Sequence, residues 1–264
     1  MIACIDGTHD GSEKILEKYN QKFKQLKILI NHENRGLGPT MNRLVYESSG
    51  EYLAVAEQDD YYYPNRLALQ VKELEKDLSV GLVSGMSEFF NGKKITFEFP
   101  GVLKSGKQYP EGKDMFLLNY RNQIKVVNSC MMFRKSVHVN NGLYFTQHHP
   151  SISVDWTYIL RFSLVSKIIG IPKILVRLDR RANRDSVTSN RTKQFRASRE
   201  LIKNFYYEFP ELISKKDFKY AMNTQRNLEL GHLARFNFIV TGLFYLIKYR
   251  DQRFLDKLLK RIFR

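Results

Sequence analysis

The first part of the chain alternates short apolar runs with longer segments in which apolar residues recur every three or four positions. Short apolar runs are typical of buried strands, and the longer recurrence is typical of amphipathic helices. The expected elements alternate in chain order, with strands at 1–5, 26–30, 51–57 and 80–85 and helices at 13–26, 39–48 and 65–77. This alternation predicts a doubly wound α/β domain, with helices packed on a sheet.

The last part of the chain has a different pattern and predicts a helical extension. We expect the α/β domain to comprise residues 1–189 and a basic helical extension to comprise residues 190–264. The longest apolar run, 236–247, is shorter than the roughly 20 residues that a membrane-spanning helix needs. Residues 254–264 place leucines on one helical face and basic residues mostly on the others. With the preceding apolar run 236–247, this pattern favours an interfacial anchor for anionic lipid. A helix that packs on the domain or on a partner is the alternative.

Composition and charge narrow the class of protein. A chain of 264 residues that is 43% apolar can bury a substantial core. Its net charge is +16, and residues 190–264 hold 17 Lys and Arg against 7 Asp and Glu, so most of the excess lies in the extension. Two cysteines are too few for a disulfide framework and indicate a reducing compartment. No segment has the pattern of a secretory signal. The sequence therefore predicts a soluble or peripheral intracellular protein.

Carboxylates follow two of the expected strands. Asp6 comes directly after the first strand, and Glu57, Asp59 and Asp60 come at the end of the third. Ligands of open α/β sheets bind beyond the carboxyl ends of the strands, so these side chains should lie on one edge of the sheet. Carboxylates gathered there suit a hard cation such as Mg²⁺ or Mn²⁺. The alternative is that they are turn and helix-cap residues, because Asp favours both positions.

Five motifs occur in an order and at spacings that resemble a known family. They are "IDGTHDGS", "NRGLGPTMNRLVYESSGEYLAVAEQDDYYYPNRL", "NSCMMFRKSV", "VDWTYILRF" and "RRANRDSVT". Together they resemble the successive landmarks of the family-2 glycosyltransferases over about residues 2–188. The resemblance implies a GT-A fold, the Rossmann-like fold of transferases that use nucleotide-diphospho-sugars. In this fold a mixed sheet is flanked by helices, and here a helical C-terminal extension follows it.

The resemblance assigns the acidic residues to the sugar donor. Asp6 matches the residue that recognises the nucleotide base, although Ile5 stands where the family usually has a second aspartate. A turn residue that bonds its own backbone is the alternative for Asp6. Glu57 and Asp59 match the motif that holds a divalent cation, Mg²⁺ or Mn²⁺, on the donor diphosphate, and Asp60 supports them. Glu57 stands where Asp is usual, and its longer side chain alters the geometry.

Asp155 matches the family's general base for the acceptor hydroxyl. In the family this base lies at the start of a helix, usually in an acidic pair, and here Val154 takes the place of the first acid. The resemblance implies a single-displacement, inverting transfer in which Asp155 removes the proton of the acceptor. A helix-cap or first-turn acid, stabilised by the helix dipole, is the alternative and is compatible with this role.

Further donor-binding residues follow from weaker matches. Asn34, Gly36 and Asn42 match a segment that shapes the donor side, although Gly36 also fits an ordinary loop glycine. Arg180 and Arg184 match a basic loop near the diphosphate and acceptor, and a solvated basic loop is the equal alternative. The adjacent His148 and His149 resemble a metal pair only superficially, and loop polarity explains them better.

One departure from the family concerns the start of the chain. The family has a further strand and helix ahead of the "DGS" turn, and that strand lies inside the sheet. Without it we expect a seam of unpaired backbone groups and an exposed apolar face. Either the sequence is a piece of a longer protein, which we favour, or the chain has lost donor binding.

The sequence as a whole predicts an inverting glycosyltransferase in cell-surface polysaccharide synthesis. Its expected partners are a nucleotide-diphospho-sugar donor, a glycan or lipid-linked acceptor and an anionic membrane surface. Its expected location is the cytoplasm, peripheral on the inner face of the cell membrane. One alternative is an inactive remnant that docks at a membrane or in a complex. A nucleic-acid-binding protein is disfavoured, because the charge lies in a tail with an apolar face and no nucleic-acid-binding motif is found.

Overall fold

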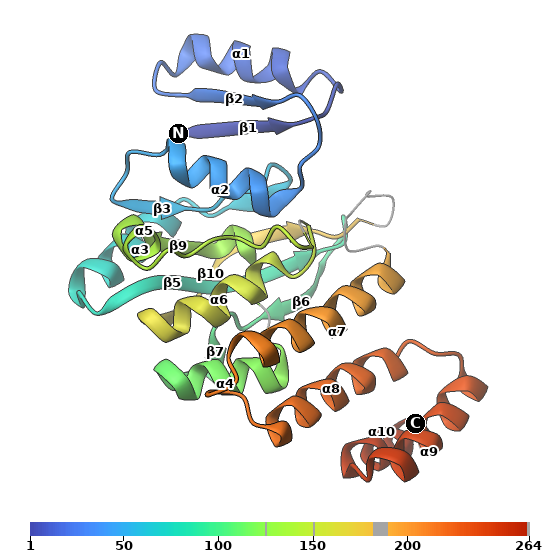
Figure 1. Cartoon of the computed structure of the whole chain (residues 1–264). Coiled ribbons are helices and arrows are strands. Elements are labelled where there is room, and N and C mark those ends of the chain that lie inside the picture. Colours follow the sequence, from blue (N-terminus) through green and yellow to red (C-terminus); the bar gives the residue numbers. More distant parts are fainter. Residues whose placement is uncertain (125, 150, 182–189, 263–264) are drawn as a thin grey trace. The chain divides into compact units, whose positions relative to one another are not determined.

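The chain folds into two compact units (Figure 1). The computed structural model describes residues 1–124, 126–149, 151–181 and 190–262. Unit 1 comprises 1–116 and 125–187, and unit 2 comprises 117–124 and 188–264. Unit 2 therefore contains the segment predicted as an extension, together with a short segment from the middle of the chain.

Unit 1 alternates strands and helices, as the sequence predicts. All the strands and helices predicted for the first part of the chain are present, with shifted ends. In chain order the elements are β1 (Ile2–Asp6), α1 (Ser12–Lys22), β2 (Lys27–Asn31), α2 (Leu37–Glu47), β3 (Tyr52–Ala54), β4 (Asp60–Tyr62), α3 (Arg66–Lys76), β5 (Val80–Phe90), β6 (Ile95–Phe99), β7 (Leu103–Lys104), β8 (Lys107–Gln108), the start of α4 (Gly112–Asn122), the 3₁₀ turn η1 (Asn128–Cys130), β9 (Met131–Arg134), α5 (Lys135–Asn140), α6 (Val154–Val165) and β10 (Lys167–Asp179).

A six-stranded mixed sheet forms the centre of unit 1 (Figure 1). Its strand order is β3-β9-β5-β10-β4, and β6 pairs with part of β5. The central pair, β5 and β10, is parallel, whereas β9 and β4 run antiparallel to their neighbours. The sheet is therefore of the mixed type that the resemblance implies.

Alternating side chains of the central strands build a core on each face of this sheet. Met131 and Phe133 of β9 pack with α2 and α6 on one face, whereas Met132 packs with α3 on the other. Leu82 and Val83 of β5 divide between the same two cores. This two-residue alternation is the ordinary consequence of a pleated strand. Helices therefore cover both faces of the sheet.

The sheet of unit 1 is divided, as the sequence predicts. β1 and β2 form a separate parallel pair, in which Ile2 lies opposite Lys27, and the described strands include none that joins this pair to the six-stranded sheet. The apolar face of α1, whose spacing predicts this helix, is also uncovered. Its residues Ile15, Tyr19 and Phe23 are each at least half exposed. The described strands thus show a break in the sheet, and α1 shows an exposed apolar face.

Unit 2 is helical. Its elements are the second half of α4, α7 (Arg191–Glu208), α8 (Lys215–Leu230), α9 (Arg235–Tyr249) and α10 (Gln252–Ile262). Ser214 begins α8 with a reciprocal capping box, because its hydroxyl accepts from the Asp217 N–H and the Asp217 carboxylate accepts from the Ser214 N–H. None of the described helices combines the length and the apolar character needed to cross a membrane.

The apolar face predicted for the last helix is buried in part inside unit 2, at Leu258. Phe254 and Leu258 of α10 are buried against Leu230 of α8 and Phe238 of α9. A leucine of this face, Leu259, stays 44% exposed. For α10 the structure thus shows the packed helix that the sequence had left as the alternative to a lipid anchor.

A buried histidine makes unit 1 sensitive to acid. His138 of α5 lies in the core against Phe133, and its Nδ1 is 2.8 Å from the Tyr158 hydroxyl. Burial, with a smaller effect of the nearby Lys135 ammonium, lowers the pKa of His138 to about 4. The imidazole of the folded protein therefore stays neutral at pH values at which the unfolded chain already binds a proton.

We expect acid to weaken unit 1 through His138. The unfolded imidazole gains its proton near its ordinary pKa of about 6.5, so the free energy of unfolding falls as pH drops from there toward about 4, by about 3 kcal/mol in all. Urea unfolding followed by the fluorescence of Trp156, the chain's single tryptophan, reports on this unit. His138→Gln should flatten the pH dependence, whereas His9→Gln on an exposed loop should not. An unchanged slope in His138→Gln would contradict the assignment.

Candidate active site

Asp6, at the end of β1, holds the loop that follows β2. Its Oδ1 accepts from the Asn31 side chain at 2.7 Å and from the Arg35 N–H at 3.0 Å, and its Oδ2 accepts from the Gly36 N–H at 2.9 Å. Partial burial raises the pKa of Asp6, but these hydrogen bonds outweigh burial and hold the pKa below its usual value. These bonds run to the loop after β2 and not to the turn that Asp6 begins.

The loop around Asp6 also positions Asn34 and Gly36. The Gly36 N–H is shared between Asp6 and the Asn34 Oδ1, at 3.1 Å from the latter. Gly36 has a φ of 85° and stands at the N-terminus of α2, so the turn uses a conformation that favours glycine. Three of the predicted donor-binding residues therefore lie together beyond the end of β1.

The acidic segment after β3 is fixed by a tyrosine of the next strand. The Tyr62 hydroxyl accepts from the Glu57 N–H at 2.6 Å and donates to the Glu57 carbonyl at 2.8 Å. Tyr62 itself is held because β4 pairs antiparallel with β10. Burial raises the pKa of Tyr62, so its hydroxyl keeps the proton that it donates. The chain therefore leaves β3 at Ala54, three residues before the predicted end of the strand, and turns through the carboxylates.

Glu57, Asp59 and Asp60 form one cluster. Each offers a carboxylate oxygen, and these oxygens all lie within 4.8 Å of one another. Two residues of η1 support the cluster: the Asn128 amide donates to Glu57 Oε1 at 3.0 Å, and the Ser129 hydroxyl donates to Asp60 Oδ2. The predicted metal residues and Asp60 are therefore brought together by the fold.

Burial and the charges of nearby acids, Asp155 among them, raise the pKa of Glu57. Burial is the largest cause that raises the pKa of Glu57, and the hydrogen bond from Asn128 opposes it. The negative charges of Asp60, Asp59 and Asp155 raise this pKa further. Asp155 lies near enough to Glu57 to act on its ionisation, although the two residues are almost a hundred positions apart in the sequence.

Asp155 occupies the first turn of α6. Ser153 precedes the helix in the left-handed conformation, with a φ of 54°, and caps it without a side-chain hydrogen bond. An acid in the first turn interacts favourably with the helix dipole. Further along the same helix, the Arg161 guanidinium lies 4.9 Å above the Tyr144 ring. The position of Asp155 fits the helix-terminus interpretation of the sequence, and its catalytic role stays a prediction.

The donor atoms of the cluster fit a divalent cation. Three carboxylates supply the hard oxygen ligands that Mg²⁺ and Mn²⁺ prefer. The Oδ1 of Asn128 is a further neutral oxygen beside Glu57, buried and without a hydrogen-bond partner among the described residues. A cation would also offset the mutual repulsion that raises the pKa of Glu57.

Two other predicted site residues, Asn42 and Arg180, make contacts outside the carboxylate cluster. Both polar atoms of the Asn42 amide pair with the Phe145 backbone, at 2.9 and 2.8 Å, which gives Asn42 a structural role. Arg180 is exposed just after β10, with its guanidinium 5.1 Å from the centre of the Phe89 ring. Arg184 lies outside the described residues.

Sequence reasoning missed Asn128 and Ser129 as supports of the cluster. They fall in the quoted segment "NSCMMFRKSV", and the available signal was a polar pair directly before a buried strand. A second missed group is an ion pair between Arg177 of β10 and Glu88 of β5, at 2.9 Å, to which Tyr63 also bonds. This group links the segment after β4 to the centre of the sheet.

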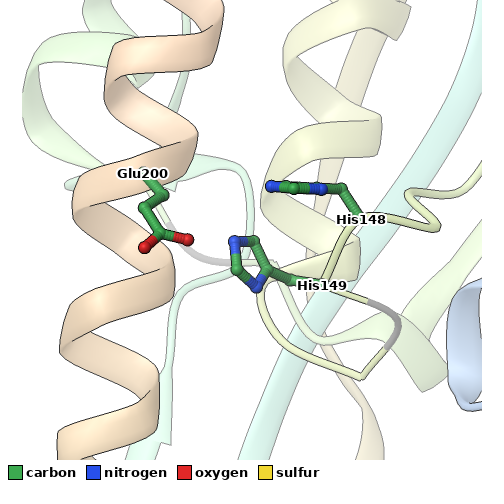
Figure 2. Close-up of side chains that lie close together, drawn as sticks. All are labelled: His148, His149 and Glu200. Atoms are coloured by element: carbon green, nitrogen blue, oxygen red, sulfur yellow. The ribbon is translucent and has the colours of Figure 1, made fainter.

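The adjacent histidines are not assigned to a site. The rings of His148 and His149 lie at 67° to each other, with centres 4.6 Å apart (Figure 2). Figure 2 also labels Glu200 of α7, which belongs to unit 2. No site is inferred across the two units.

Comparison with known proteins identifies the family. The model of "Glycosyl transferase family 2" matches residues 1–140, more than half of the chain. The chain belongs to glycosyl transferase family 2. It is 27% identical over 153 residues to the putative glycosyltransferase EpsE of Bacillus subtilis, a stretch that covers 55% of each protein. The chain thus spans about half the length of this relative.

Solved structures confirm the GT-A fold. TarS 1–349 of S. aureus has a TM-score of 0.61 at 16% identity, covering 99% of this chain and 72% of that one. TarS is also known in complex with UDP-GlcNAc. The mannosyltransferase PcManGT of Pyrobaculum calidifontis, solved with GDP-Man and Mn²⁺, has a TM-score of 0.53 at 13% identity and covers 99% of this chain and 77% of that one.

We expect Gly7→Ala to disrupt the loop around Asp6. Gly7 has a φ of 66°, and a β-carbon there would lie 2.2 Å from the backbone nitrogen of Asn34. The left-handed strain and this clash should together lower the free energy of unfolding by about 3 kcal/mol. Gly11→Ala is the matched control, because Gly11 also has a positive φ but its β-carbon would meet nothing within 4 Å. Urea unfolding compares them, and equal losses would contradict the steric argument.

Proposed function

We propose that the chain carries the catalytic site of an inverting glycosyltransferase. The enzyme would transfer a sugar from a nucleoside-diphosphate donor to a hydroxyl of a glycan or lipid-linked acceptor. The observation that carries this proposal is the cluster of Glu57, Asp59 and Asp60, together with the effect of the Asp155 charge on the pKa of Glu57. A base for the acceptor and a cation site for the leaving group are the two groups that such a transfer needs.

The cation site is assigned to Glu57 and Asp59, with Asp60 in support. A bound Mg²⁺ or Mn²⁺ would stabilise the negative charge that develops on the diphosphate as the sugar leaves. The two hydrogen bonds of the Tyr62 hydroxyl keep the backbone of Glu57 in place, and the hydrogen bond from Asn128 orients the Glu57 carboxylate. PcManGT, a structure of the same fold, was solved with GDP-Man and Mn²⁺.

The donor is assigned to the edge of the sheet beyond β1 and β3. Asp6 would accept hydrogen bonds from the nucleotide base, and the loop that it holds, with Asn34 and Gly36, would line the donor. Arg180, a cation just after β10, would contact the diphosphate. TarS, which shares the fold, is known with UDP-GlcNAc.

The acceptor step is assigned to Asp155. Its carboxylate would take the proton of the acceptor hydroxyl as the oxygen attacks the anomeric carbon, and the bond to the diphosphate breaks on the opposite side. One displacement inverts the configuration of that carbon. The exposed basic surface of unit 2 suits an acceptor made on the inner face of the cell membrane, as in cell-surface polysaccharide synthesis.

Asp59→Asn should weaken cation-dependent donor binding by about 100-fold, because it removes a charged ligand of the cation. Calorimetric titration of UDP- and GDP-sugars in the presence and absence of Mn²⁺ measures this effect. Glu51→Gln is the matched control, since it removes one carboxylate from the opposite, exposed end of β3. Cation-dependent affinity that is unchanged in Asp59→Asn would overturn the metal assignment.

Asp155→Asn should lower turnover by about 100-fold or more while donor affinity changes little, because the base acts on the acceptor and not on the donor. Asp114→Asn provides the control, since Asp114 is likewise an acid in the first turn of a helix, α4. Donor titration and a transfer assay are run on both variants. Full activity in Asp155→Asn refutes the base, and a parallel loss of donor affinity indicates a structural cap.

A further inference from the structure

Helix α9 exposes an apolar stripe along its whole length. Each stripe residue is between 48% and 77% exposed, and together they are Phe236, Val240, Leu243, Phe244 and Ile247. Steps of three and four residues place all five on one helical face over three turns. Isolated exposed apolar side chains are normal on a protein surface, but a continuous row of large ones marks an interaction site.

The opposite face of α9 already has its partner inside unit 2. Phe238 and Gly242 are buried there, and a β-carbon at Gly242 would lie only 2.7 Å from the Leu258 side chain of α10. Ile239 and Leu246 pack against the same core. Helix α9 is thus apolar on two sides, and the core of unit 2 accounts for only one of them.

The charged residues of α9 and its C-cap are all positive. Helix α9 contains no Asp or Glu, and exposed cations lie at its two ends, Arg235 at the start and Lys248 and Arg250 at the finish. The Lys248 ammonium lies 5.1 Å above the Phe244 ring, so the cation borders the stripe directly. Beside Leu259, helix α10 adds Lys260, also exposed. An apolar row with cations at both ends complements a surface that is apolar inside and anionic outside.

We propose that α9 is a membrane-contacting helix that lies flat on an anionic lipid bilayer. The stripe would enter the boundary between headgroups and acyl chains, and Arg235, Lys248 and Arg250 would contact lipid phosphates. This interaction would bring the enzyme to a lipid-linked acceptor. The proposal rests on the proposed function for that purpose, whereas lipid binding itself does not require it.

A second copy of the chain fits this stripe less well. Antiparallel pairing of two α9 helices would bring Arg235 of one copy toward Lys248 and Arg250 of the other. Parallel pairing would bring Lys248 toward Lys248. In either arrangement α9 has no carboxylate with which to compensate these like charges. Anionic phosphates, in contrast, neutralise all of the cations at once.

The test is cosedimentation of the 264-residue chain with two kinds of vesicle, phosphatidylcholine alone and equal parts phosphatidylcholine and phosphatidylglycerol. The double variant Phe236→Glu/Ile247→Glu places two charges on the stripe at positions that are each 77% exposed, so the fold should be kept. Its partition onto the anionic vesicles should fall at least about tenfold. The control Tyr207→Glu/Leu78→Glu adds the same charges at positions 77% and 82% exposed on other elements, and should bind as the parent does.

The charge requirement is tested separately. Arg235→Gln/Lys248→Gln leaves the stripe intact and should lower partition onto the anionic vesicles about tenfold, with little effect on phosphatidylcholine vesicles. Light scattering of the parent and of the stripe variant establishes their oligomeric states. Circular dichroism shows whether each variant is folded.

The outcomes separate this proposal from its rivals and from the proposed function. It is overturned if the parent fails to bind anionic vesicles, or if the stripe variant binds as well as the parent does. A parent oligomer that the stripe variant dissociates, without vesicle binding, shows an interface between copies instead. Vesicle binding needs neither donor nor Mn²⁺, so its presence or absence is independent of whether Asp155 and Asp59 act in transfer.

Discussion

Repulsion among carboxylates at one edge of the sheet is the constraint on which the site of unit 1 depends. One carboxylate oxygen of each residue lies within 4.8 Å of the others, and at that limit two unit charges near a protein surface repel by about 3 kcal/mol, which is a large part of the stability of a domain. The fold tolerates this crowding because the Tyr62 hydroxyl bonds the backbone of Glu57. Asn128 donates a hydrogen bond to the Glu57 carboxylate, and Ser129 donates one to the Asp60 carboxylate. Burial is the largest cause that raises the pKa of Glu57, and the charges of Asp60, Asp59 and Asp155 raise it further. A cation would offset these charges, so the apo site favours metal binding.

The elements that carry this edge could be predicted from the sequence, whereas the supports could not. Apolar runs located β1, β3 and β5, and the family motifs located Glu57, Asp59 and Asp155. Strand β4 was not predicted, because its three residues are too few to show alternation of apolar and polar side chains. This strand nevertheless carries Tyr62. Asn128 and Ser129 reach the cluster from about seventy residues away. A contact of that range is set by how β9 pairs with β3 and β5, and no local pattern encodes it.

Unit 2 shows the same limit for amphipathic helices. The sequence pattern of α10 correctly indicates an apolar face, but a helical period does not say what covers that face. In the structure Phe254 and Leu258 of α10 fill the core of unit 2, and the uncovered stripe lies on α9 instead. The apolar run 236–247 is too short for a spanning helix, and the sequence groups it with the last helix as one possible lipid anchor. In helix α9 this run has two faces. Phe238 is buried on one and Phe236 is exposed on the other, a difference that depends on how unit 2 folds.

The two units thus use charge of opposite sign, and they respond to different ions. The cluster of unit 1 is anionic, so if it binds an anionic nucleotide-sugar as proposed, donor affinity is expected to depend on a divalent cation. The surface of α9 is cationic, so its attraction to lipid is screened by monovalent salt, while the apolar part of the interaction persists. Under the two proposals, a chelator is therefore expected to act on the donor site and to leave α9 unaffected. Moderate salt weakens lipid contact more than it weakens coordination by partly buried carboxylates, because burial limits screening. The two activities proposed for the chain are accordingly separable in solution without any mutation.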